Sequence, residues 1–383
     1  MGKQKSAAGD GNPERACARA AKWLSPVPQS RLSQPLSLAS EVIATNIYDI
    51  AKQAGVSIAT VSRVLNGSKN VSPKTERRVL TVMEESGYTP NVFARGLGLN
   101  TMRTIGILCT DVSDLYYSKA VSILEKLLRE LGYDSLLCCT GDSPEQKKKS
   151  LEMLANKRVD AMLMIGSGFR ENLKNEQLES IAKQVPIVII NGDIRLKNTY
   201  SVLCDELGAM KQCVHLLSRA GYRNILYLYD VTTYSSIQKL LGYREGLAEC
   251  GIPLQEGLIV RTERNLLHIR RQVSALLDQK LPFSAVLAAE DLLAVGAQQA
   301  LSGRGLRMPV VGFDNSLLAE CATPPLTSVD NMVDSLCGTA VRMLGELFAG
   351  AQAAERVTIS ARLVERESFR FSSAAQPEPS NES

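Results

Sequence analysis

The chain has 383 residues, of which 45% are hydrophobic and 22% charged, so it is long enough for two or three domains of ordinary globular composition. A net charge of +4 excludes a general polycation, and no apolar run approaches the roughly 18 residues of a membrane-spanning helix. Nine cysteines without a Cys-x-x-Cys pair, and two histidines without metal-ligand spacing, predict reduced, mostly buried thiols in a cytosolic protein and no metal site.

The two ends of the chain differ from what lies between them. Residues 1–44 are rich in Ala, Ser, Pro and Gln and show no sustained hydrophobic period, and residues 371–383 are similar. Such segments bury too little apolar surface to offset the entropy of ordering, so we predict a disordered N-terminal extension and a disordered tail. The extension holds no continuous apolar stretch of about 7–15 residues, so we do not expect a signal peptide.

Residues 45–90 predict a small helical domain. The first helix has apolar residues at the spacing of one helical face, namely Ile47, Ile50, Ala51 and Ala54. Gly55 ends this helix, and Ser57 can cap a second one, whose buried stripe is Val61, Val64 and Leu65. Two short helices around a glycine-containing turn form a helix-turn-helix, whose second helix fits the major groove of DNA.

A third helix and a shorter fourth one follow. Ser72 can cap the third helix, and Pro73 stands at its first position, where the missing N–H costs nothing. Its apolar face, which can close a small core, is Val79, Val82 and Met83. Asn91 can cap a hinge helix within the linker 91–102. This helix has under two turns, so we expect it to order only against a partner.

The exposed face of the second helix carries the residues that we expect to read DNA bases: Ile58, Ala59, Thr60, Ser62, Arg63 and Asn66. Ile58 offers an apolar contact, for instance to a thymine methyl group, and Arg63 can donate two hydrogen bonds to guanine O6 and N7. Alternatively, Arg63 is solvated or contacts a phosphate. Residues 46–100 hold seven basic and four acidic side chains, a balance that suits a phosphate backbone.

From about residue 104, buried strands alternate with helices, which predicts parallel sheets covered by helices. The pattern restarts at SVLCDE (201–206), so we predict two doubly wound lobes within 103–370. The first lobe would comprise about 103–199 plus 330–346, and the second about 200–329 plus 347–370. Ligands of such sheets bind beyond the carboxyl ends of the strands, which predicts a ligand site in the cleft between the lobes.

The run IYDIAKQAGVSIATVSRVLNGSKNVSPKT, followed by GYTPNVFARGL, closely resembles the DNA-binding headpiece of the lactose-repressor/galactose-repressor family of bacterial transcription regulators. The remainder, to about residue 370, resembles the family's periplasmic-binding-protein-like core, in which the chain crosses between the lobes three times. The resemblance implies a repressor whose affinity for operator DNA is controlled by a sugar or sugar derivative. The family usually begins within a few residues of the first helix, so residues 1–44 are a departure.

The resemblance also implies roles for individual residues at the DNA. Positions that mainly contact phosphates in the family are Tyr48, Ser57, Asn70, Ser72, Thr75 and Tyr88. The two tyrosines could instead serve the small core. In the hinge, Asn91, Ala94 and Leu97 match DNA-contacting positions. Leu97 corresponds to a leucine that wedges into the minor groove and kinks the duplex, although an ordinary linker leucine remains the alternative.

For the effector, the resemblance implies the residues Tyr116, Tyr117, Asn191, Ser235, Lys239, Arg264, Asp291 and Asn331. The Asp291 carboxylate can accept two sugar hydroxyls, unless it caps the helix that follows. Lys239 stands where the family commonly has Arg, and Arg264 stands where a neutral or aromatic residue is usual. Two cations near one cleft favour an anionic ligand such as a sugar acid or a sugar phosphate.

Several functions compete at this point. We favour a cytoplasmic, nucleoid-associated regulator that binds pseudo-palindromic DNA as a homodimer, since symmetric dimers suit such sites and no leucine heptad follows residue 370. The alternatives are a solute-binding sensor with a vestigial headpiece, a catabolite-control-type regulator with a phosphocarrier protein as partner, and an enzyme. The first strand–helix turn of the core, TDVSDLYY, lacks a glycine cradle for a dinucleotide, so we predict neither enzyme activity nor a cofactor.

Overall fold

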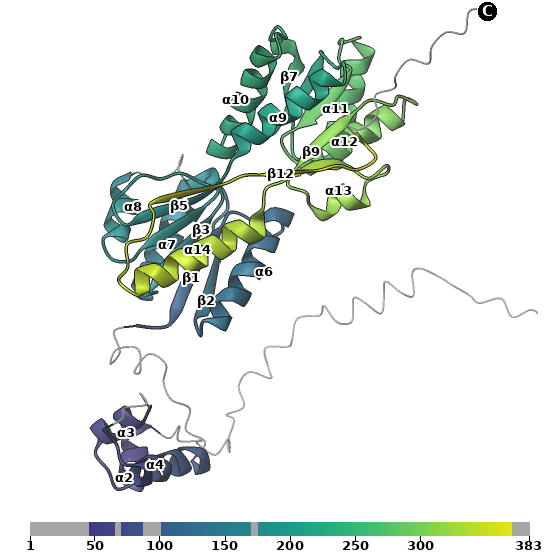
Figure 1. Ribbon diagram of the computed structural model, residues 1–383. Helices are drawn as coiled ribbons and strands as arrows, with labels where there is room; N and C mark the ends of the chain where they lie inside the picture. The colour runs from purple at the N-terminus through teal and green to yellow at the C-terminus, as the bar shows by residue number, and fades with distance from the viewer. Residues whose placement is uncertain (1–45, 66–69, 87–100, 170–174, 370–383) are drawn as a thin grey trace, which may run out of the picture. The chain divides into compact units, whose positions relative to one another are not determined.

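The computed structural model describes residues 46–65, 70–86, 101–169 and 175–369, which belong to two compact units divided after Pro90. The first unit is an all-α headpiece, and the second is an α/β core of two lobes (Figure 1). This is the predicted fold class. The predicted N-terminal extension, hinge helix and tail lie outside the described residues.

The headpiece consists of three short helices, α2 (Ile47–Gln53), α3 (Ile58–Leu65) and α4 (Pro73–Glu85). They bury one small apolar cluster, whose members are Ile50, Ala51, Ala54, Val61, Val64, Val79 and Met83. All three predicted helices are therefore present, and each buries the predicted stripe against the other two. Leu65 and Val82 are only partly buried at the margin of the cluster.

Side-chain caps set where these helices begin. The Ser57 and Ser72 hydroxyl oxygens accept hydrogen bonds from the backbone N–H groups of Thr60 and Thr75, at 3.2 Å in both cases. Gly55 has φ +59°, a left-handed conformation that glycine adopts without strain, and it separates α2 from α3. The turn between the two helices is thus built as the sequence predicts.

The first lobe is a six-stranded parallel sheet in the order β11-β5-β4-β3-β1-β2. Its strands are β1 (Thr104–Cys109), β2 (Asp134–Cys139), β3 (Ala161–Ile165), β4 (Ile187–Ile190), β5 (Thr199–Cys204) and β11 (Arg356–Ile359). One face packs on α6 (Leu115–Glu130) and α14 (Val333–Phe348), and the other on α7 (Pro144–Asn156) and α8 (Asn175–Ala182). Because both faces are covered, every residue of β3 and β4 is buried and apolar.

The second lobe has the same plan, with strand order β12-β10-β9-β8-β6-β7 and only β12 antiparallel. Its strands are β6 (Ile225–Tyr229), β7 (Ile259–Arg261), β8 (Ala285–Ala288), β9 (Val310–Phe313), β10 (Thr327–Asp330) and β12 (Arg362–Val364). The helices α9 (Glu206–Arg219) and α10 (Tyr234–Glu249) cover one face. The other face is covered by α11 (Leu266–Asp278), α12 (Asp291–Ser302) and α13 (Leu317–Cys321).

The chain crosses between the lobes three times, as the family resemblance implied: after β5, after β10, and between β11 and β12. The second crossing returns α14 to the first lobe, where it lies beside α6 although the two helices are far apart in sequence (Figure 1). Three connecting segments therefore join the lobes at one side of the cleft.

The predicted division of the core between the lobes was wrong at two places. The strand β5 was assigned to the second lobe from residue 200, but it pairs with β4 in the first sheet. Residues 347–370 were also assigned to the second lobe, but β11 pairs with β5 in the first sheet. Hydrophobic periodicity identifies a buried strand but not the sheet that it joins, because both sheets bury their strands in the same way.

Within the described ranges, every helix is too short or too polar to span a lipid bilayer. Of the eight cysteines in these ranges, five are buried: Cys109, Cys138, Cys204, Cys213 and Cys337.

The headpiece offers a direct test of its small core. Ile50 is fully buried, so Ile50→Ala should cost about 2–5 kcal/mol of headpiece stability. This loss of stability is large for a core of seven residues, so the headpiece should unfold and DNA binding should be lost. Circular dichroism and limited proteolysis of the full chain, together with DNA binding, measure the effect.

The matched control is Ile58→Ala, because Ile58 is 41% exposed in the same headpiece. That variant should keep the headpiece folded and resistant to protease. Equal destabilisation by both substitutions would contradict the described core.

Candidate DNA-binding and ligand-binding sites

The helix α3 presents opposite faces to the core and to solvent. Val61 and Val64 are buried, whereas Ile58, Ala59 and Arg63 are exposed. Ile58 is 41% exposed and Arg63 is exposed, so neither belongs to the headpiece core and both are available to a binding partner. Among the described base-reading candidates, Ile58, Ala59 and Arg63 thus lie on the solvent face, with Thr60 and Ser62 half-buried at its edges.

Most of the predicted phosphate-contacting residues are also at the surface. Tyr48 is 67% exposed, which rules out its alternative role in the small core. Ser57 and Ser72 precede the first turns of α3 and α4, where unpaired backbone N–H groups and the helix dipole favour a phosphate. Asn70 is exposed and Thr75 is half-buried. The predicted residues that lie outside the described ranges are Asn66, Tyr88, Asn91, Ala94 and Leu97.

A cavity of about 940 Å³ lies between the two lobes of the core. It is lined by segments at the carboxyl ends of strands of both sheets, which is where the predicted ligand site was placed. Seven of the eight predicted effector residues line it: Tyr116, Tyr117, Asn191, Ser235, Lys239, Arg264 and Asp291. The eighth, Asn331, is buried behind the wall and donates to Asp314 Oδ1 at 3.0 Å.

A buried network occupies the side of the cavity near the crossings. Glu206, at the start of α9, accepts hydrogen bonds from Asn191 Nδ2 at 3.0 Å and from the Ser235 hydroxyl. Lys239 Nζ lies 3.8 Å from Glu206 Oε1, donates to Ala289 O at 2.9 Å and lies 4.0 Å from the centre of the Phe313 ring. Three predicted ligand residues are thus held mainly by protein groups and join the first lobe to the second.

The opposite wall carries two aromatic residues at the start of α6. Tyr117 Oη lies 3.4 Å from Thr110 Oγ1. Residue 166 must be glycine, because a Cβ there would lie 2.6 Å from Tyr117 Oη. Tyr116 Oη is buried and has no hydrogen-bond partner among the described residues. A buried hydroxyl of this kind favours a ligand that completes its hydrogen bond.

Asp291 lines the cavity, as expected of an effector contact, and it is also held by hydrogen bonds within its own lobe. Asp291 is 2% exposed, and its two oxygens accept hydrogen bonds from Ser316 N at 2.7 Å, Ser316 Oγ at 2.8 Å and Ser328 Oγ at 2.6 Å. It is the first residue of α12 rather than the cap, which is Glu290. Because its lone pairs are largely used within the second lobe, Asp291 shapes the wall of the cavity more than it offers acceptors to a ligand.

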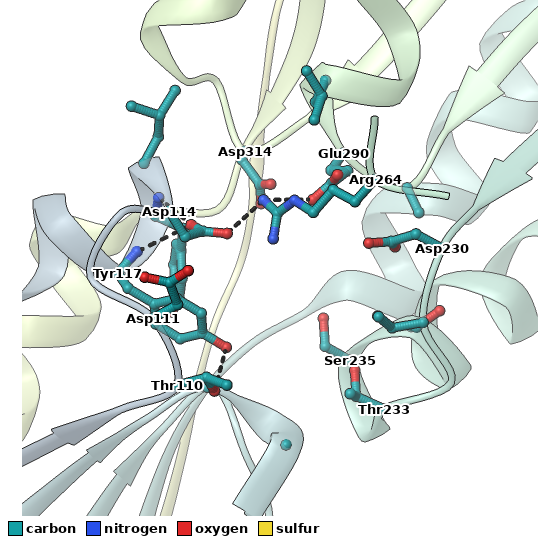
Figure 2. Close-up of a pocket in the computed structure, with 18 of the residues that line it drawn as sticks. Thr110, Asp111, Asp114, Tyr117, Asp230, Thr233, Ser235, Arg264, Glu290 and Asp314 are labelled. Carbon is teal, nitrogen blue, oxygen red and sulfur yellow. Dashed lines mark hydrogen bonds and ion pairs between the residues drawn. The ribbon is translucent and has the colours of Figure 1, made fainter. Parts of the chain in front are cut away.

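Arg264 lies at the centre of the cleft between the lobes (Figure 2). Its guanidinium pairs with Asp114, the residue that caps α6 in the first lobe, and with Glu290 Oε2 at 3.1 Å in the second. Asp230 and Asp314 lie near the same guanidinium. Burial lowers the pKa of Arg264, but Glu290, Asp114 and Asp230 together raise it above its usual value. The guanidinium therefore connects the lobes through two ion pairs.

Sequence reasoning missed the carboxylates around Arg264. Their positions in the sequence could have revealed them. Asp230 directly follows β6, Asp314 directly follows β9, and Glu290 lies two residues after the end of β8. The carboxyl ends of parallel strands meet at one edge of a sheet, so side chains at these positions converge. Asp314 also has φ +101°, an uncommon conformation that is concentrated at functional sites.

These carboxylates argue against the predicted anionic ligand. That prediction counted Lys239 and Arg264 as cations available to a ligand, but Lys239 lies beside Glu206, and Arg264 is paired with Asp114 and Glu290. A carboxylate or phosphate entering the cleft would also approach Asp230 and Asp314. Like charges in a partly desolvated cavity repel, so the cleft disfavours an anion.

The comparisons with known proteins agree with this architecture. Residues 46–91 match the model of bacterial regulatory proteins of the lacI family, and residues 214–369 match a periplasmic binding protein-like domain. An HTH-type transcriptional regulator of Lachnoclostridium phytofermentans is 46% identical over 85% of this chain and 100% of its own length. The regulator DegA of Bacillus subtilis is 35% identical over 85% of this chain and 98% of its own.

Solved structures show the same similarity. The lac repressor dimer bound to operator and the anti-inducer ONPF superimposes with a TM-score of 0.75 at 25% identity, covering 85% of this chain and 98% of that one. The transcriptional regulator CelR in complex with cellobiose gives 0.62 at 27% identity, covering 85% and 100%. The chain belongs to the lacI family of bacterial regulatory proteins. It is a DNA-binding transcriptional regulator with a ligand-binding core.

The cleft carboxylates predict a pH dependence of stability. Burial, together with Asp230, raises the pKa of Glu290 to about 8, whereas an unfolded glutamate titrates near 4.3. Between these values the unfolded chain binds fewer protons than the folded one, so this group's contribution to stability falls as the pH rises. Glu290→Gln stays neutral and removes this contribution. Its melting temperature should therefore fall less than that of the unchanged protein between pH 5.5 and about 8.

Glu263→Gln is the control, because the Glu263 side chain is 76% exposed on the same wall of the cavity. It should leave the pH profile of the melting temperature unchanged. Identical profiles for all three proteins would contradict the electrostatic assignment of Glu290.

Proposed function

We propose that this protein is a cytoplasmic transcriptional repressor that binds pseudo-palindromic operator DNA as a homodimer. A small ligand bound in the core controls its affinity for that DNA. The observation that carries the proposal is the exposed face of α3, where Ile58 and Arg63 stand on a separately folded headpiece. This face has the size and chemistry that a major groove accepts.

Within this proposal the headpiece residues act in two groups. Ile58, Ala59, Thr60, Ser62, Arg63 and Asn66 read base edges, and Tyr48, Ser57, Asn70, Ser72, Thr75 and Tyr88 position the helix on the phosphates. Asn91, Ala94 and Leu97 form a hinge element that orders on DNA, with Leu97 inserted into the minor groove at the centre of the operator. Support for the second and third groups comes from the family resemblance and, for Tyr48, from its exposure.

The ligand acts at the cleft between the lobes. The solved structures that resemble this chain include the lac repressor with an anti-inducer and CelR with cellobiose, which supports a carbohydrate-sized ligand here. We propose contacts with Tyr116, Tyr117 and Arg264. Asn191, Ser235, Lys239, Asp291 and Asn331 contact the ligand or hold the groups that do. Binding changes how the lobes are arranged, and that change alters DNA affinity. In this function the core binds its ligand without chemical transformation.

The test starts from DNA, because the operator sequence is unknown. Purified full-length protein is used to select duplexes from a randomised library, and the selected and scrambled duplexes are compared by fluorescence anisotropy at several salt concentrations. We expect a selected site with two-fold symmetry, bound more tightly than the scrambled one and more weakly as salt increases. Equal affinity for both duplexes would refute sequence-specific regulation.

Arg63→Ala tests the base-reading assignment. The substitution should cost about 1–3 kcal/mol on the selected site and relax the preference at one base pair in each half-site, because two hydrogen bonds to a guanine are lost. Repeating the selection with the variant measures both effects.

Arg78→Ala serves as the control, since Arg78 carries the same charge on the exposed surface of α4. It should leave base preference unchanged. If Arg63→Ala also leaves base preference unchanged, Arg63 does not read a base.

A further inference from the structure

The cavity is lined by more carboxylates than Lys and Arg side chains, of which there are three: Lys239, Arg261 and Arg264. Four carboxylates lie around the single guanidinium of Arg264, namely Asp114, Asp230, Glu290 and Asp314. Arg264 is ion-paired with two of them, Asp114 and Glu290. Asp230 and Asp314 have no ion-pair partner within 4 Å among the described residues, although Lys239 is the main opposite charge acting on Asp314, which also accepts a hydrogen bond from Asn331.

Three residues that line the same cavity each have a buried polar atom without a hydrogen-bond partner among the described residues. Glu290 Oε1 is buried and has no hydrogen-bond partner among the described residues, although its other oxygen pairs with Arg264. Thr262 is 6% exposed, lines the cavity and leaves its hydroxyl without a partner in the described ranges. Tyr116 Oη is in the same condition. Buried polar groups are nearly always hydrogen-bonded, so these three atoms indicate where a ligand contributes donors and acceptors.

We propose that the effector of this cleft is a small hydroxylated organic cation, such as an amino sugar, whose ammonium group lies among Asp230, Glu290 and Asp314. Its hydroxyl groups then complete the hydrogen bonds of Thr262 and Tyr116. The inference rests on the proposed function and specifies the chemical class of ligand at the same site.

Charge distinguishes this ligand from its neutral and acidic relatives. An ammonium group donates up to three charge-assisted hydrogen bonds, and Asp230, Glu290 and Asp314, which come from different segments of the second lobe, line the same cavity near Arg264 as acceptors. A neutral sugar brings no positive charge to Asp230 and Asp314 and leaves Glu290, whose pKa is raised to about 8, largely protonated at pH 7. A uronic acid brings a further negative charge to the cleft. The pKa of Glu290 is raised by burial and by Asp230, so the arriving cation also favours the ionised form of Glu290 and displaces its proton.

The experiment compares matched sugars on the full-length protein. Glucosamine, galactosamine and mannosamine are each tested beside the parent hexose, the N-acetyl derivative and the corresponding uronate, by thermal shift and by calorimetry at pH 7. We expect at least one amino sugar to bind about tenfold or more tightly than its parent hexose, and its N-acetyl derivative and uronate to bind more weakly still. Calorimetry in buffers of different ionisation enthalpy should show proton release with the amine and not with the hexose.

Variants then locate the cation. Glu290→Gln and Asp230→Asn should each reduce amine affinity toward that of the parent hexose and raise the melting temperature of the ligand-free protein at pH 8. Glu263→Gln, at the exposed carboxylate on the same wall, should change neither property. The comparison of sugars on the unchanged protein does not depend on any variant folding correctly.

The outcomes separate this inference from the proposed function. A hexose or uronate that binds as tightly as its amine, or the absence of binding by every amino sugar at millimolar concentration, overturns the cationic ligand. If a neutral sugar binds at least as tightly as its amine and shifts DNA affinity, ligand-controlled repression stands and the cation is wrong. If an amino sugar binds tightly but leaves DNA affinity unchanged, the cation is supported and the coupling to DNA is wrong.

Discussion

The ion pairs of Arg264 with Asp114 and Glu290 connect the two lobes across the cleft. Asp114 caps α6 by accepting the N–H groups of Tyr116 and Tyr117, so the same carboxylate fixes two aromatic residues of the cavity wall. A change at the guanidinium therefore reaches both lobes and both tyrosines. In a regulator whose lobes are joined by three chain crossings, a contact of this kind can bias how the lobes are arranged.

A second set of contacts surrounds Glu206, close to the first crossing. Asn191 comes from the first sheet, and Ser235 and Lys239 come from α10 in the second lobe. Burial raises the pKa of the Glu206 carboxyl, while Lys239, Ser235 and Asn191 favour its ionised form. The cleft thus has a satisfied network on the side of the crossings and an unsatisfied acidic cluster around Arg264. A ligand can therefore form more new hydrogen bonds and ion pairs at the acidic cluster around Arg264 than at the network around Glu206.

The ligand class depends on side chains that the family resemblance does not specify. The resemblance directed attention to Lys239 and Arg264 and hence to an anion. The structure shows that each cation already lies near carboxylates, Lys239 near Glu206 and Asp314 and Arg264 near Asp114 and Glu290, and that Asp230 has no ion-pair partner within 4 Å among the described residues. Residue types alone do not fix the charge of a ligand, because the charge that a cavity presents depends on how its ionisable groups pair.

The sequence by itself determined the headpiece helices and their caps at Ser57 and Ser72, the alternation of strands and helices in the core, and the position of the cleft, because these depend on local periodicity and turn chemistry. Only the tertiary structure decided that β5 and β11 join the first sheet, that the oxygens of Asp291 are used within the second lobe, and that Asp114 and Glu290 meet at Arg264. These features bring together residues as far apart in the chain as Asp114 and Glu290, and no local pattern encodes which partners such residues find in the folded protein.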